Sequence, residues 1–142
     1  MSNHIHMLLK EEKEPISVIM KRISSSYVYY YNLRYGRCGH LFQERFKSEV
    51  VENDSYFLTV LRYIHRNPIK ANMVKELKEY KWSSYNEYVN KLNRSKIIDT
   101  DFSLRIFSED EDTAIKRFIS FNNEINEDKC LECEENKKIN DT

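Results

Sequence analysis

The sequence predicts an α+β fold, because two short strand-like segments and several helix-like segments follow one another along the chain. Residues 4–9 alternate polar and apolar side chains and then become wholly apolar, as expected of a half-buried strand. Residues 46–51 have the pattern of a second strand. Other segments carry apolar residues at steps of three and four, which is the period of an amphipathic helix.

The longest predicted helix begins at Pro15, whose fixed φ suits a first helical turn, and runs to about Arg34. Gly36 and Gly39 follow it and end the helical pattern. Its apolar stripe consists of Ile16, Ile19, Met20, Ile23, Tyr27, Tyr30 and Tyr31.

A second helix is expected after an N-cap at Asn53 or Asp54. It should end at Asn67, because Pro68 disfavours helical geometry at the residue before it. Its apolar stripe is formed by Phe57, Leu58, Leu61 and Ile64. Residues 82–85 are interpreted as a turn that enters a short helix.

The composition divides the chain into four parts. Residues 1–90 form the predicted α+β domain, and residues 91–98 form a polar linker. Residues 99–125 are predicted to hold two accessory helices, capped by Asp101 and Asp112, and residues 126–142 an acidic, flexible tail.

The net charge of zero hides two opposite halves. Residues 1–98 carry 17 Lys and Arg against 10 Asp and Glu, a net of +7, whereas residues 99–142 carry 6 against 13, a net of −7. This asymmetry favours a part that meets nucleic acid joined to an acidic part. No apolar run approaches the roughly 18 residues that a membrane span needs. The three cysteines form no disulfide framework, which predicts a cytoplasmic protein.

Four residues are candidates for metal-assisted chemistry. His4 and His6 share one face of the first predicted strand, where two imidazoles can bind one divalent ion. Tyr63 and Asn67 share one face of the second helix, as a nucleophile and a third ligand. Taken singly, each pair has a commoner explanation: solvated histidines, and a core tyrosine followed by a helix C-cap.

Basic and polar residues near several aromatic residues suit single-stranded nucleic acid, since cations meet phosphates and bases stack on rings. The alternative is a solvated basic face beside core aromatics. The candidate DNA-binding residues are Gln43, Arg45, Lys47, Arg62, Arg66 and Lys70. The nearby aromatic residues are Tyr29, Tyr30, Tyr31, Tyr35 and Phe42. His40 and His65 have no obvious partners and are expected at the surface.

Four stretches, in this order and spacing, closely resemble the single-tyrosine HUH transposases. Within that family the chain is most similar to the REP-associated tyrosine transposases of small insertion sequences. The stretches are Ser2-Asn-His-Ile-His-Met-Leu-Leu9, Gly39-His-Leu-Phe-Gln-Glu-Arg-Phe46, Tyr63-Ile-His-Arg-Asn-Pro-Ile-Lys-Ala-Asn-Met-Val74 and Tyr80-Lys-Trp-Ser-Ser-Tyr85.

The resemblance implies a role for each candidate. Tyr63 would be the nucleophile that attacks a single-stranded DNA phosphodiester and leaves a 5′-phosphotyrosine. His4, His6 and Asn67 would hold Mg²⁺ or Mn²⁺. The implied partner is hairpin-forming single-stranded DNA, and the family includes both dimers and monomers, which allows a homodimer.

The resemblance also implies a partial ferredoxin-like HUH domain followed by short C-terminal helices. In the family a strand, a helix and a second strand precede the His-x-His strand, whereas this chain begins at that strand. The chain is therefore expected to be truncated at its N-terminus and to be of doubtful activity. The alternative is a nucleic-acid-binding remnant that no longer cleaves, and a third interpretation is a small structural protein with an acidic interaction segment.

Overall fold

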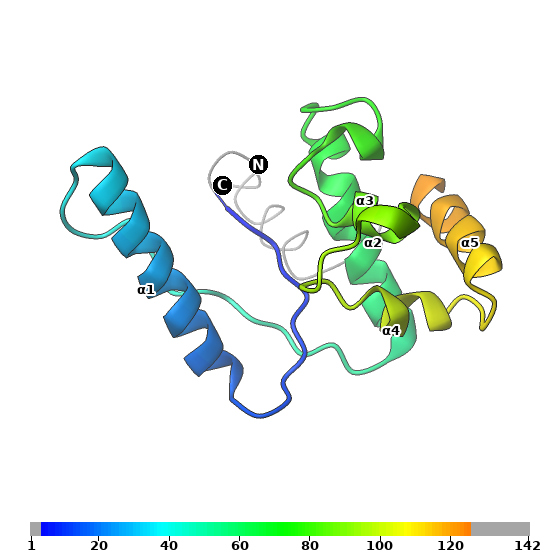
Figure 1. Cartoon of the computed structure of the whole chain (residues 1–142), viewed down its shortest axis with the longest axis horizontal. Helices are drawn as coiled ribbons and strands as arrows, with labels where there is room; N and C mark the ends of the chain where they lie inside the picture. The colour runs from blue at the N-terminus through cyan, green and yellow to red at the C-terminus, as the bar shows by residue number, and fades with distance from the viewer. Residues whose placement is uncertain (1–3, 126–142) are drawn as a thin grey trace, which may run out of the picture. The chain divides into compact units, whose positions relative to one another are not determined.

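The computed structural model describes residues 4–125, and its regular structure is helical (Figure 1). The predicted acidic tail, residues 126–142, lies outside the described residues. The helices are α1 (Ile16–Tyr35), α2 (Asp54–Lys70), α3 (Tyr85–Val89), α4 (Thr100–Arg105) and α5 (Glu111–Asn123), with short 3₁₀ turns η1 (Leu77–Glu79) and η2 (Lys91–Asn93).

The predicted α+β, ferredoxin-like fold is wrong for the part of the chain that the structure describes. Residues 4–9 and 46–51 are extended or irregular, and no β-strand is present between residues 4 and 125. An alternating pattern makes a segment suitable for a sheet, but a strand exists only when a neighbour pairs with its backbone N–H and C=O groups. Neither segment is part of a sheet within residues 4–125.

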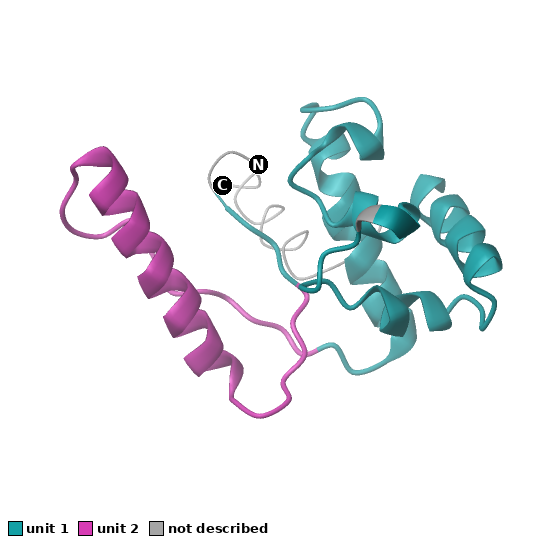
Figure 2. Ribbon diagram, in the orientation of Figure 1, with its two compact units in different colours: residues 1–7, 51–142 teal, residues 8–50 magenta. Residues whose placement is uncertain are grey.

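The chain divides into two compact units, which Figure 2 colours separately. Unit 2 comprises residues 8–50 and contains α1, whose predicted range of 15–34 is confirmed within one residue. Met20 is the buried residue of this helix. Gly36 ends the helix in the left-handed region at φ 59°, which glycine adopts without steric cost.

Unit 1 comprises residues 1–7 and 51–142 and contains α2 to α5. Its aromatic core centres on Phe118 of α5, which is fully buried. The Phe118 ring stacks on Tyr88 of α3 at a centroid distance of 4.7 Å and lies 5.6 Å from the ring of His65 on α2. Through Phe118, helix α5, which follows the predicted linker, packs against α2 and α3.

Helix α2 begins as predicted and ends one turn later than predicted. The Asn53 side chain accepts a hydrogen bond of 2.9 Å from the Tyr56 backbone N–H and so caps the helix. Pro68 lies inside the helix, which continues to Lys70. Pro68 is buried, so packing of its ring outweighs the preference of the preceding residue for extended geometry.

The caps of the last two helices lie two residues before their predicted positions. Asp99, not Asp101, accepts from the Phe102 N–H at 3.1 Å, and Asp110, not Asp112, accepts from the Thr113 N–H at 2.8 Å. In each pair both aspartates precede an apolar run, so the sequence alone does not distinguish the cap from an acidic residue in the first turn.

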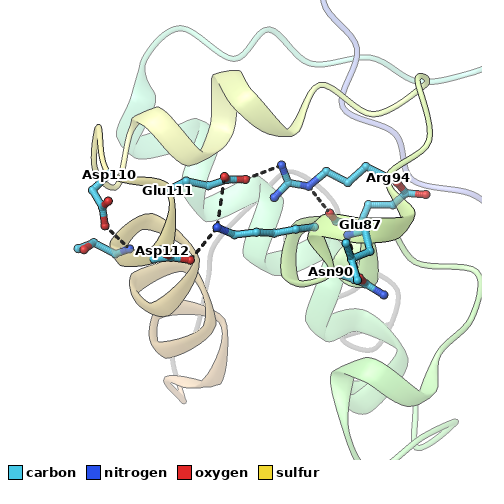
Figure 3. Close-up of polar contacts among 9 residues, drawn as sticks. Glu87, Asn90, Arg94, Asp110, Glu111 and Asp112 are labelled. Carbon is cyan, nitrogen blue, oxygen red and sulfur yellow. Dashed lines mark hydrogen bonds and ion pairs between the residues drawn. The ribbon is translucent and has the colours of Figure 1, made fainter.

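Ion pairs connect the start of α5 to the segment around η2, as Figure 3 shows. Arg94 Nη1 lies 2.8 Å from Glu111 Oε1, and Lys91 Nζ lies 2.7 Å from Asp112 Oδ1. The hydrogen bond from Arg94 lowers the pKa of Glu111. Acidic groups also suit a helix N-terminus, where the macrodipole is positive. Lys91 and Arg94 thus connect the predicted linker to α5.

His65 is buried, although the sequence suggested a surface position. It is 1% exposed, and both ring nitrogens have partners. The Asn122 amide donates to the Phe118 carbonyl, so its oxygen faces His65 and accepts from Nδ1–H at 3.1 Å. Nε2 then accepts from the Ser84 hydroxyl at 2.9 Å. Burial disfavours the charged ring and lowers the His65 pKa to about 4.

Acidification is expected to destabilise unit 1 through His65. Its pKa is depressed on folding, from 6.5 to about 4. The stability is therefore complete above pH 6.5 and is lost as pH falls toward 4, by up to about 3 kcal/mol. Urea denaturation between pH 7.5 and 4 measures the loss. His65→Asn should flatten this part of the profile, whereas His40→Ala, at an exposed histidine, should not; an unchanged slope in His65→Asn would contradict the assignment.

Candidate active site

One face of α2 carries three of the candidate residues. Tyr63, Asn67 and Lys70 are spaced four and three residues apart, so they lie above one another on the helix. Because α2 continues past Pro68, Lys70 belongs to the same helix as Tyr63 and Asn67. The Lys70 Nζ lies 5.5 Å from the centroid of the Tyr63 ring.

The segment before residue 8 brings both histidines to this face of α2. His6 Nε2 lies 3.1 Å from the Asn67 side-chain amide, across a separation of 61 residues. The His6 ring meets the Tyr63 ring edge-on, with centroids 5.6 Å apart, and the His4 ring lies 4.9 Å from His6. The structure thus gathers His4, His6, Tyr63 and Asn67 in one place within unit 1.

The donor set suits a divalent ion. Two ligands bound at right angles about 2.1 Å from one ion lie about 3 Å apart, which is close to the separation of His6 Nε2 and the Asn67 amide. A half-turn of the amide directs its oxygen toward the same point. Two imidazoles with one amide oxygen favour Mn²⁺ over Mg²⁺, which prefers oxygen ligands throughout. Within residues 4–125 no group of three or more His, Cys, Asp or Glu side chains could hold a metal, so an ion bound here would need the amide oxygen as its third ligand.

The Tyr63 ring is held in a defined orientation. Its side chain belongs to the core and is 8% exposed. The ring packs against His6 on one side and lies under the ammonium group of Lys70. These two contacts fix the ring within the core, so the position of its hydroxyl group is also defined.

The basic candidates divide into two groups. Arg62 is 4% exposed, and its guanidinium lies 4.0 Å from the centroid of the Phe121 ring. Arg66 donates to the Asn122 carbonyl at 2.8 Å. Both guanidinium groups therefore face α5. The exposed candidates are Gln43, Arg45 and Lys47 in unit 2 and Lys70 in unit 1.

Arg62 and His65 are both buried, although their polar side chains favour a surface position. Leu58, Leu61, His65 and Pro68 follow one another at steps of three and four, and Arg62 adjoins this row. The helical period therefore signals that His65 continues the apolar stripe.

A comparison with protein families places this site within a transposase-like segment. Residues 1–67 match the model of a transposase family. That family is described as "Transposase IS200 like", and the match runs through His4, His6 and Tyr63 to Asn67. No curated protein and no solved structure matches the chain. Among residues 4–125, no helix has both the length and the apolar character needed to cross a membrane.

Proposed function

We propose that this chain is a DNA transposase that cuts and rejoins single-stranded DNA, with Tyr63 as the nucleophile. The observation that carries the proposal is the contact of His6 with Tyr63 and Asn67. His6 and Asn67 are 61 residues apart in the sequence. The match of residues 1–67 to an IS200-like transposase family supports it. The order of the four sequence stretches favours the REP-associated subgroup.

The residues of α2 have separate tasks in this reaction. The Tyr63 oxygen attacks the phosphorus, its proton passes to water, and the bond from phosphorus to the 3′-oxygen breaks. The departing oxygen takes up a proton and becomes a free 3′-OH, while the 5′-phosphate stays on Tyr63. Attack by a 3′-OH reverses each change and releases the tyrosine, so rejoining requires no nucleotide cofactor.

His4, His6 and Asn67 would hold the metal ion. A bound divalent ion would offset the charge of the phosphodiester and polarise it toward attack. Lys70 adds a positive charge beside Tyr63 that attracts the same phosphate. Gln43, Arg45 and Lys47, all exposed, are proposed to contact the DNA strand. A hairpin-forming strand and a homodimer are part of the proposal.

The polarity of the reaction gives a direct test. The chain is incubated with a single-stranded hairpin oligonucleotide carrying a label at its 3′ end or at its 5′ end. With Mn²⁺, we expect the 3′ label to become covalently attached to the protein and the 5′ label to leave on a fragment with a free 3′-OH. EDTA should prevent both. Attachment of the 5′ label would contradict the polarity, and metal-dependent DNA binding without any adduct would support the non-cleaving alternative.

A further inference from the structure

The second half of α1 and the loop after it carry a cluster of aromatic rings, formed by Tyr27, Tyr30, Tyr31, Tyr35 and Phe42 and called here the tyrosine cluster. Tyr27 lies 6.5, 6.1 and 6.3 Å from the ring centroids of Tyr30, Tyr31 and Phe42. Tyr31 and Tyr35 are 4.5 Å apart. All five rings belong to unit 2.

The cluster is held together but remains accessible. The Asn32 side chain donates to the Gly39 carbonyl at 3.0 Å and so fixes the loop that carries Phe42. Tyr30 and Tyr35 are 55% and 59% exposed, and Tyr27 and Phe42 are 46% and 44% exposed. These rings therefore keep a large exposed area within a cluster of defined ring–ring distances.

The surroundings of the tyrosine cluster are basic. Residues 27–47 contain four Lys and Arg and a single acidic residue, Glu44, a net of +3. The Arg37 guanidinium lies 5.8 Å from the centroid of the Tyr31 ring. Stacking faces beside cations match the two components of a single strand, its bases and its phosphates.

We propose that the tyrosine cluster binds unpaired bases of single-stranded DNA by stacking. The nature of the ligand rests on the proposed function, whereas the cluster lies outside the residues that carry the chemistry. The basic surroundings favour a polyanion over a second copy of the chain, because two such surfaces would repel each other. Tyrosine rings also stack on any base, which suits a surface that holds a strand without reading its sequence.

The affinity for two DNA probes separates stacking from simple charge attraction. One probe is an oligothymidylate, and the other has the same length with abasic positions in place of most bases. Measurements use the full chain with Tyr63→Phe, which prevents cleavage. We expect this protein to prefer the thymidylate, and Tyr30→Ala with Tyr35→Ala to reduce that preference roughly 10-fold or more. Tyr30→Phe should retain it, because the ring remains.

Tyr29→Ala is the matched control, since Tyr29 lies on the same helix and is more exposed, at 72%, yet lies outside the cluster. Circular dichroism checks that the variants keep their helices. Equal preference in all variants would overturn the inference, as would a loss in Tyr29→Ala of the same size. A change from dimer to monomer in Tyr30→Ala with Tyr35→Ala, with the base preference intact, would instead assign the cluster to self-association. If the double variant loses the base preference while the chain with its native Tyr63 forms no adduct, that result would retain the inference and reject the proposed function.

Discussion

Replacing Tyr63 by phenylalanine is expected to abolish the covalent protein–DNA adduct. The substitution removes only the oxygen that would bond to phosphorus. The ring that packs against His6 and under Lys70 stays in place, so the fold and the metal ligands should be unaffected. Without a nucleophile the adduct yield should fall on the order of 10³-fold or more. Gel separation of labelled protein after incubation with Mn²⁺ and a 3′-labelled strand measures the effect.

Tyr56→Phe supplies the matched control for this loss. Tyr56 also lies on α2, about two turns before Tyr63, and is likewise a tyrosine. Its variant should form the adduct at the wild-type level. Affinity of Tyr63→Phe for single-stranded DNA should also be unchanged, because the variant loses no positive charge. An adduct that persists in Tyr63→Phe would show that another residue is the nucleophile.

The components of the candidate site could be predicted from the sequence because each depends on local spacing. Tyr63 and Asn67 share a face in any helix that includes both. The approach of His6 to that face is a long-range contact, and it was expected only through the family resemblance. The boundaries of α1 were predictable for a similar reason, since the helical period and Gly36 are local signals.

The errors concern features that depend on the rest of the molecule. Whether residues 4–9 and 46–51 form strands depends on a pairing partner, and their own pattern does not contain that information. Pro68 remains helical because it is buried in unit 1. His65 can be buried because Ser84 and Asn122, far away in sequence, provide its hydrogen bonds, and this burial lowers its pKa.

The structure also shows that α2 depends on residues beyond the family match. The match ends at Asn67, but α2 also packs through Arg62, His65 and Arg66 against α5. The acidic half of the chain therefore provides part of the support for the helix that carries Tyr63. The charge pattern separates the acidic half from the part expected to meet DNA, and it does not predict this packing.

Phe118→Ala should be the most destabilising single substitution considered, at about 4 kcal/mol for unit 1, because it removes a fully buried ring and leaves a cavity. The ring contacts Tyr88, His65 and Phe107, so its loss loosens α5 from α2 and α3. Urea denaturation measures the change. Phe102→Ala is the control, because its ring is 44% exposed and its loss should cost much less.

If α5 positions the nucleophile through this core, the adduct yield of Phe118→Ala should fall with the folded fraction and recover at lower temperature or urea concentration. A full yield from a protein whose α5 has detached would instead show that α2 needs only residues 1–67 and its own helical propensity.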